Sequence, residues 1–188
     1  SLLFDEPNDT SSNEIKVENF NNEVIHSNMM GASKSSGWQH ATTHGSLTPK
    51  TQGYSQVLYA VYPFIKGRTL EEVLSDVNFD EGRRLNVAAG IVRRLAEIHD
   101  VNILHRDLKP RNILVDDNDE VYIIDFEASI RNGTKARVYG TREYMSPSQL
   151  GEERQYDGIG EDLYEIMGVL FELATGRKLY EIRKSHNM

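Results

Sequence analysis

The chain has 188 residues, no cysteine and a formal net charge of −8. The lack of cysteine excludes disulfide bridges, thiolate zinc sites and cysteine nucleophiles, and the acidic balance argues against a general nucleic-acid binder. No run of about 18 apolar residues occurs, so we expect no transmembrane helix and no membrane partner.

The N-terminal third is polar and carries weak periodicity. Residues 31–53 have a loop-like composition rich in Ser, Thr and Gly. Before them, residues 14–18 alternate polar and apolar side chains as a short strand does, and residues 20–30 have the apolar spacing of a short helix. A β-rich run at residues 57–62 then ends at Pro63.

Two helices are predicted next. Thr69 is expected to cap a short helix that runs to about Asp76, because Glu72 stands at the capping-box position. Asp80 is expected to cap a longer helix whose arginines, including Arg94, lie mostly on the polar face. Its predicted apolar face contains Leu85, Ala88, Ile91, Val92, Leu95 and Ile98.

The remaining elements are a hairpin and a final helix. Residues 113–115 and 121–124 are predicted strands, joined by an acidic turn at residues 116–119. Residues 128–157 show no sustained period. Residues 161–174 predict a helix, with apolar positions at Leu163, Ile166, Met167, Leu170, Phe171 and Ala174.

Polar residues suited to phosphoryl transfer gather between residues 104 and 127. Asp107 on a loop could orient a hydroxyl as a general base, and Lys109 could neutralise a phosphoryl group. Asn112 and Asp125 are oxygen donors of the kind that Mg²⁺ prefers. Each of these residues alone could be a turn former or a strand cap, but the joint spacing favours the catalytic interpretation.

Residues 105–112, His-Arg-Asp-Leu-Lys-Pro-Arg-Asn, resemble the catalytic loop of the eukaryotic-type protein kinases. The resemblance implies that Asp107 is the catalytic base, Lys109 the phosphate-neutralising residue and Asn112 a metal ligand. A lysine at position 109 is typical of serine/threonine kinases. Residues 125–127 stand where the Asp-Phe-Gly motif belongs, which implies that Asp125 holds metal across the phosphates.

Two further segments resemble the same family. Residues 140–147 are similar to the end of the activation segment, which implies that Thr141 bonds to Asp107 and Lys109. Asp162 lies in a helix similar to the family's Asp-x-Trp helix, which implies that Asp162 holds the backbone of the catalytic loop.

The resemblance covers roughly residues 57–180 and implies an α+β, two-lobed protein-kinase-like fold. We expect residues 1–64 to form a reduced, β-rich N-lobe with flexible segments. Residues 65–188 would form a shortened, mainly helical C-lobe that lacks the last helices, within a single kinase domain overall.

The chain also departs from the family pattern. No G-x-G-x-x-G motif precedes Lys16, so the phosphate-covering loop is missing, degenerate or cut away. Lys16 is our candidate for the lysine that positions the ATP phosphates, with Glu23 as its ion-pair partner; the alternative is an exposed strand lysine. Glu127 replaces the glycine of the metal-binding motif, where it would restrict backbone freedom or add an acidic group.

We therefore expect transfer of phosphate from ATP to Ser or Thr of a protein, with Mg²⁺, or Mn²⁺ in its place. The compact architecture resembles the minimal kinases that some bacteria inject as effectors, which implies a cytoplasmic site of action in a host cell and a host protein as target. A pseudokinase scaffold is one alternative, disfavoured by Asp107, Asn112 and Asp125. A small-molecule kinase is the other, disfavoured by residues 140–147.

Overall fold

The computed structural model describes residues 2–4, 43–47, 57–150 and 158–185. Lys16 and Glu23 lie outside the described residues, as do the strand and the helix predicted at residues 14–18 and 20–30.

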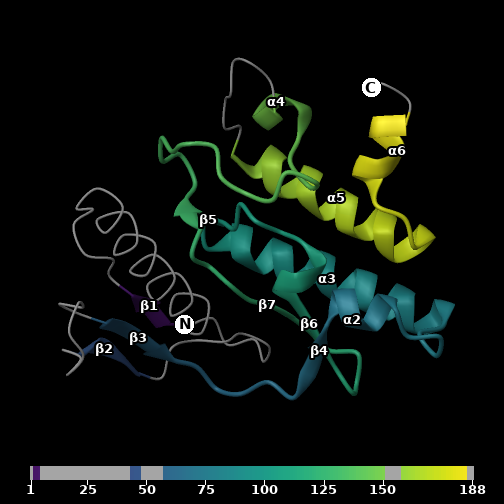
Figure 1. Ribbon diagram of the computed structural model, residues 1–188, viewed down its shortest axis with the longest axis horizontal. Helices are drawn as coiled ribbons and strands as arrows, with labels where there is room; N and C mark the ends of the chain where they lie inside the picture. The colour runs from purple at the N-terminus through teal and green to yellow at the C-terminus, as the bar shows by residue number, and fades with distance from the viewer. Residues whose placement is uncertain (1, 5–42, 48–56, 151–157, 186–188) are drawn as a thin grey trace.

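The first described sheet is formed by three antiparallel strands in the order β1-β3-β2. These strands are β1 (Leu2–Phe4), β2 (Thr43–Leu47) and β3 (Val57–Val61). In register, Leu2 pairs with Tyr59 and Thr43 pairs with Val61. Strand β3 confirms the strand predicted from residue 57, and it leads into the rest of the chain (Figure 1).

The predicted capping box is present at the start of α2 (Leu70–Leu74). The Thr69 amide donates to Oε2 of Glu72 at 2.8 Å, and the Glu72 amide donates to Oγ1 of Thr69 at 3.3 Å. The box directly follows β4 (Gly67–Thr69), so it fixes the point where the strand turns into the helix.

Helix α3 (Glu81–Asp100) begins after Asp80, whose Oδ1 accepts the Arg83 amide at 2.9 Å. Its predicted apolar face is partly wrong, because Leu85 and Val92 are 66% and 51% exposed whereas Arg94 is 2% exposed. The helix packs on β7 (Val121–Ile123), and the residues it buries are Val87, Gly90, Ile91, Arg94, Leu95 and Ile98.

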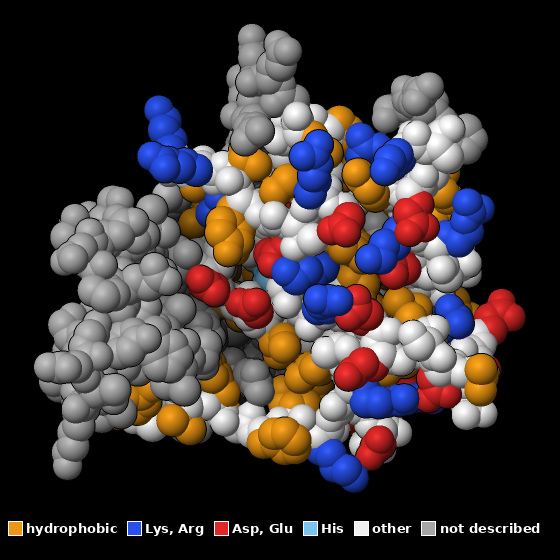
Figure 2. All heavy atoms as spheres, in the orientation of Figure 1, with side chains coloured by type: hydrophobic (Ala, Val, Ile, Leu, Met, Phe, Trp, Pro, Cys, Tyr) orange, Lys and Arg blue, Asp and Glu red, His pale blue; other side chains and the backbone are white. Residues whose placement is uncertain are grey.

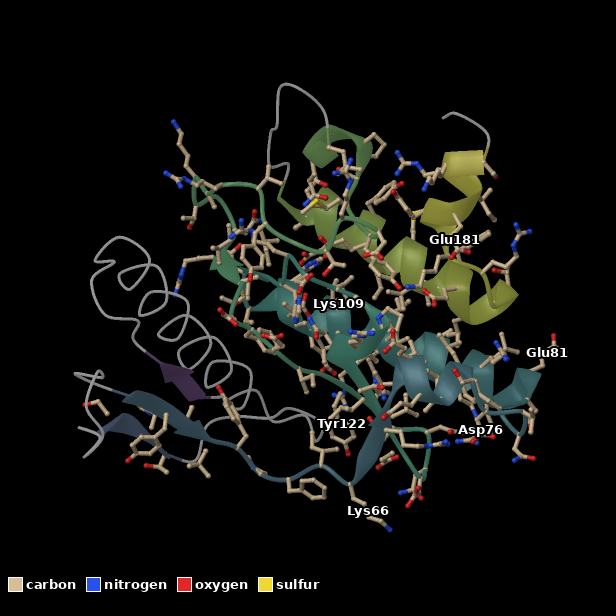
Figure 3. The ribbon with its side chains drawn as sticks, in the orientation of Figure 1. Lys66, Asp76, Glu81, Lys109, Tyr122 and Glu181 are labelled. Carbon is tan, nitrogen blue, oxygen red and sulfur yellow. The ribbon has the colours of Figure 1, made fainter. Side chains whose placement is uncertain are left out.

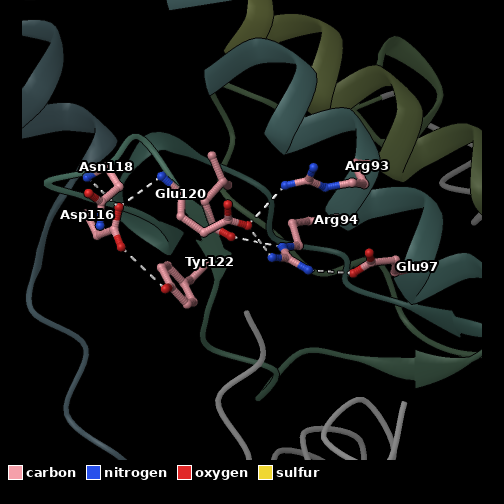
Figure 4. A network of polar contacts seen from close by, with 8 residues as sticks. Arg93, Arg94, Glu97, Asp116, Asn118, Glu120 and Tyr122 are labelled. Carbon is pink, nitrogen blue, oxygen red and sulfur yellow. Dashed lines mark hydrogen bonds and ion pairs between the residues drawn. The ribbon is translucent and has the colours of Figure 1, made fainter. Parts of the chain in front are cut away.

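The predicted hairpin is formed by β6 (Ile113–Asp116) and β7, which join β4 in a second antiparallel sheet of order β4-β6-β7. Arg83 of α3 binds both carboxylate oxygens of Asp119 in the turn between β6 and β7. Arg94 donates to the Val121 carbonyl at 3.0 Å and to Glu97 at 2.9 Å, and it also contacts Glu120 (Figure 4).

Helix α5 (Ile159–Thr175) confirms the helix predicted at residues 161–174, but not all of its predicted apolar positions are inside. Leu163 and Met167 are 47% and 63% exposed. Four carboxylates are also buried, and only Asp162 among them was expected under the catalytic loop: Glu161, Asp162, Glu165 and Glu172. Helix α5 runs beside α3 (Figure 1), and Arg84 of α3 donates to the Leu173 carbonyl at 2.6 Å.

Short elements also form outside the predicted helices and strands. Strands β5 (Ile103–Leu104) and β8 (Ile130–Arg131) pair with each other. Helix α4 (Pro147–Leu150) follows them, and the unpredicted helix α6 (Leu179–Ser185) comes after α5.

Helices and antiparallel sheets thus combine as expected for an α+β fold, and one apolar core joins α2, α3, α5 and the hairpin. On the face shown in Figure 2, acidic and basic side chains of the described residues are interspersed. No helix in the described ranges is both long enough and apolar enough to cross a membrane.

Candidate active site

The loop between β5 and β6 carries Asp107 and Lys109, and its backbone is held by α5. Oδ2 and Oδ1 of Asp162 accept the amides of His105 and Arg106, each at 2.8 Å. Arg106 has a left-handed φ of 71°, a conformation that is costly for a side chain of this size. The hydrogen bonds from the fully buried Asp162 hold the loop in that shape.

Asp107, Lys109 and Thr141 form one hydrogen-bonded cluster. Lys109 Nζ lies 2.6 Å from Oδ2 of Asp107 and 2.9 Å from Oγ1 of Thr141. The Thr141 hydroxyl donates to Oδ1 of Asp107 at 2.7 Å, so both contacts that the resemblance implied for Thr141 are present. The cluster joins the catalytic loop to the segment before α4, and Lys109 lies near the centre of the described part (Figure 3).

Asn112 and Asp125 are brought together by the backbone. Asn112 ends the 3₁₀ turn Pro110–Asn112, and its carbonyl accepts the Ile124 amide at 3.0 Å. The Asn112 Nδ2 donates to the Asp107 carbonyl at 2.9 Å, which leaves Oδ1 for another partner. Asp125 is exposed and has a left-handed φ of 68°.

This pair of oxygen donors fits a hard divalent cation. Within the described residues, no three His, Asp or Glu side chains are grouped as a metal site of their own. A cation held by Asn112 and Asp125 would therefore need further ligands from a bound phosphate and from water, as Mg²⁺ usually does.

His105 and Phe126 connect the loop to the Asp125 motif through the interior. Their rings meet edge to face with centroids 5.0 Å apart. Nδ1 of His105 accepts the Asp107 amide at 3.3 Å, so the proton lies on Nε2, which donates to the Ile124 carbonyl at 3.0 Å. Glu127, the residue that replaces glycine, is only partly buried beside this contact.

The segment from Ala128 to Tyr144 packs back onto the loop. Arg106 donates to the Ala128 carbonyl at 3.1 Å, and its guanidinium lies 5.9 Å from the centre of the Tyr139 ring. The Tyr144 hydroxyl donates to Glu172 of α5 at 2.7 Å. Burial is the largest cause that raises the pKa of Tyr144 above its ordinary value, and this hydrogen bond is the next largest. The phenol therefore stays neutral.

A polar cavity of about 190 Å³ opens beside Lys109 and Thr141. On its wall, Arg111 donates to Glu71 of α2 at 2.7 Å. Because Lys109 and Thr141 line the cavity, a polar group of a ligand can reach the cluster of Asp107, Lys109 and Thr141 through it. Its lining residues are Glu71, Lys109, Pro110, Arg111, Thr141, Glu143, Tyr144 and Lys178.

Sequence reasoning missed two side chains that support the loop. Nε2 of His99 lies 2.9 Å from Oδ2 of Asp162, and Glu165 accepts the Leu108 amide at 2.7 Å. The spacing contained a signal for Glu165, because residues three apart share a helix face and Asp162 was expected under the loop.

The sequence profile of the protein kinase domain matches residues 11–188. A putative proline-rich receptor-like protein kinase of Arabidopsis thaliana is 34% identical over 131 residues, which cover 64% of this chain and 18% of the relative. The serine/threonine-protein kinase pkn3 of Myxococcus xanthus is 32% identical over 144 residues, covering 69% and 26%.

A third relative, the probable serine/threonine-protein kinase PknB of Corynebacterium glutamicum, is 32% identical over 135 residues, covering 68% of this chain and 21% of the relative. The matched region thus spans about a quarter or less of these three proteins. The family profile covers almost the whole chain, and the fold combines a small sheet of N-terminal strands with a helical C-terminal part. The chain belongs to the protein kinase family.

Proposed function

We propose that the chain transfers the terminal phosphoryl group of ATP to a serine or threonine hydroxyl of a protein substrate. The observation that carries the proposal is the Asp107, Lys109 and Thr141 cluster, in which a carboxylate, a cation and a hydroxyl are fixed at hydrogen-bond distance. Phosphoryl transfer needs little covalent help from the protein, so positioning and charge compensation of this kind are the main requirements.

In the proposed reaction, the carboxylate of Asp107 orients the substrate hydroxyl and takes up its proton. The hydroxyl oxygen forms a bond to phosphorus as the bond from phosphorus to the leaving ADP oxygen breaks. Three donors, from Lys109, Thr141 and Asn112, fix the orientation of the Asp107 carboxylate. Its oxygens keep further lone pairs for the substrate, and the Lys109 ammonium is close enough to balance charge on the transferred group.

Asn112 and Asp125 are the residues that would hold Mg²⁺ with the nucleotide. The bound metal would neutralise phosphate charge. Lys16, with Glu23 as its partner, remains our candidate for positioning the phosphates; both residues lie outside the described part of the chain.

The acceptor is proposed to enter through the polar cavity beside Lys109 and Thr141. A serine or threonine acceptor is supported by the contact between these two residues and by the names of two relatives, which are called serine/threonine-protein kinases. Action on a host protein after injection by a bacterium stays a prediction from the sequence resemblance.

The test is transfer from radiolabelled ATP to casein and histone with Mg²⁺, followed by phosphoamino-acid analysis. We expect phosphoserine or phosphothreonine from the wild type and a loss of about 100-fold or more in Asp107→Asn. The matched control is Asp117→Asn, which removes an exposed carboxylate in the β6–β7 turn and should leave the rate unchanged. Asp125→Asn should also abolish the thermal shift produced by Mg²⁺ and ATP.

Each contrary result has its own meaning. If Asp107→Asn transferred phosphate as fast as the wild type, Asp107 would not be the base and the proposed mechanism would be wrong. A thermal shift with no transfer by the wild type would indicate a binding scaffold. Transfer to sugars or aminoglycosides, with none to protein, would indicate a small-molecule kinase.

A further inference from the structure

A second acidic residue of α5 lies under the catalytic loop beside Asp162. Glu165 is fully buried, and its Oε2 accepts the amide of Leu108, the residue after Asp107, at 2.7 Å. Asp162 binds the amides of His105 and Arg106, and the Asp107 amide donates to Nδ1 of His105. All four amides from His105 to Leu108 therefore have a partner, and Glu165 supplies the last one.

The other oxygen of Glu165 faces a different segment. A methyl group built on Gly140 would lie 3.2 Å from Oε1 of Glu165 and 2.8 Å from the carbonyl oxygen of Arg106. Gly140 precedes Thr141, whose hydroxyl donates to Asp107. One side chain thus binds the residue that follows the base and lies against the residue that precedes its threonine partner.

The surroundings of Glu165 favour a neutral carboxylic acid. Burial, then the nearby charge of Asp162, raises the pKa of Glu165 well above its ordinary value, and Asp107 and Glu161 act in the same direction. The hydrogen bond from Leu108 lowers the pKa but does not offset these effects.

Three basic or imidazole side chains beside this cluster, all in the described part of the chain, form hydrogen bonds with other groups. His99 of α3 is bonded to Asp162, the His105 ring is bonded to Ile124, and the guanidinium of Arg106 is bonded to Ala128. Oε1 of Glu165 accepts no hydrogen bond from the described residues. A buried carboxylate oxygen without a donor is costly, so the protonated form of Glu165 is favoured.

We propose that Glu165 is a positioning residue that holds Leu108 and Gly140 in a fixed relation and thereby sets Asp107 against Thr141. This inference rests on the proposed phosphoryl transfer. Glu165 is fully buried and bonds to the Leu108 amide, so its effect is transmitted through the loop backbone. The side chain that suits this role is a long one with a neutral polar end, and glutamine satisfies the same requirements.

The first test compares steady-state kinetics of Glu165→Ala and Glu165→Gln. We expect Glu165→Ala to lose about 100-fold in kcat, as a displacement of about 1 Å at a catalytic group can cause, with KM for ATP unchanged. Glu165→Gln should retain kcat, because its amide oxygen can accept from Leu108 and its NH₂ can donate toward Arg106. The matched control is Glu161→Ala, since Glu161 is a buried carboxylate of the same helix that binds Ser148 instead of the loop.

The second test does not depend on activity. Hydrogen exchange of the Leu108 amide, followed by NMR, should be faster in Glu165→Ala than in the wild type, and unchanged in Glu165→Gln and Glu161→Ala. If Glu165→Ala does not fold, Glu165→Asp, whose side chain is one methylene shorter, should show the same faster exchange and reduced kcat.

The proposal is overturned if Glu165→Gln is impaired as much as Glu165→Ala, or if Glu161→Ala lowers kcat as much as the Glu165 variants. Unchanged exchange of Leu108 in both Glu165→Ala and Glu165→Asp would also overturn it. A wild type without transfer would refute the proposed function alone, because the exchange experiment still decides whether Glu165 holds the loop.

Discussion

Arg94 is the side chain through which helix α3 holds the β6–β7 hairpin. It is 2% exposed and donates to the Val121 carbonyl, to Glu97 and to Glu120. We predict that Arg94→Met destabilises the fold substantially, although methionine is apolar and fills part of the same volume. Met cannot bind the carbonyl, and it leaves the two carboxylates without their shared cation.

The size of the loss follows from how exposed the partners are. The buried Val121 carbonyl loses a charged donor, which costs about 1.5–3 kcal/mol. Glu97 and Glu120 are 23% and 38% exposed, so water can solvate them and the loss stays below the upper value of about 5 kcal/mol for a broken buried pair. We expect about 3 kcal/mol in total, which lowers Tm by about 6–12 °C in a domain of this size.

Arg93 provides a matched control. It donates to the same Glu120 oxygen at 3.0 Å, but its side chain is 56% exposed. Arg93→Met should therefore cost at most about 1 kcal/mol. Urea unfolding followed by circular dichroism at 222 nm measures both variants. Equal losses of stability in the two variants, or a gain in Arg94→Met, would refute the argument that burial makes Arg94 contribute more to stability than Arg93.

Two further predictions concern α3 and α5. A methyl group on Gly90 would lie 2.8 Å from Cγ2 of Val121, so Gly90→Ala should lose about 1 kcal/mol despite its better helix propensity. In the exposed first turn, a methyl group on Gly82 would lie 3.3 Å from Oδ1 of Asp80, so the gain in helix propensity is partly offset and Gly82→Ala should change stability by at most about 0.5 kcal/mol. Equal urea midpoints for the two variants would contradict this contrast. The pKa of Glu165 is raised in the folded chain, so the folded chain retains a proton that the unfolded chain releases above about pH 4.3. The contribution of Glu165 to the free energy of unfolding is therefore complete below that pH and is lost as the pH rises through the folded pKa. Glu165→Gln does not titrate and should gain relative to the wild type by up to about 1.4 kcal/mol per pH unit; urea unfolding at a series of pH values measures this difference, and a difference independent of pH would contradict it.

The elements that the sequence predicted well are those with local signals. The capping box at Thr69 and the start of α3 after Asp80 depend on contacts three residues apart. The strands of the β6–β7 hairpin are apolar runs on either side of an acidic turn. The contact of Thr141 with Asp107, which lies 34 residues earlier, was not predicted by a local signal; the resemblance to the kinase family implied it.

The wrong predictions share one physical cause. Periodicity assigns charged residues to the surface and apolar residues to the interior, but Arg94 and Glu165 are buried because each finds a backbone partner in another element. Leu85 and Met167 are exposed because the buried faces of α3 and α5 are used for these polar contacts and for close packing. Partners more than 25 residues away could not be identified from spacing alone.

The hydrogen bonds under the catalytic loop also constrain how the molecule folds. The hairpin and α3 are joined by contacts between residues 26 to 36 positions apart, such as those of Arg94 and Arg83. The loop around Asp107 depends on Asp162 and Glu165, which lie 56 or 57 positions beyond the amides they bind. Closing longer segments costs more entropy, so the hairpin can dock on α3 before the loop takes its final shape. The catalytic motif therefore gains its geometry only when α5 has folded against it.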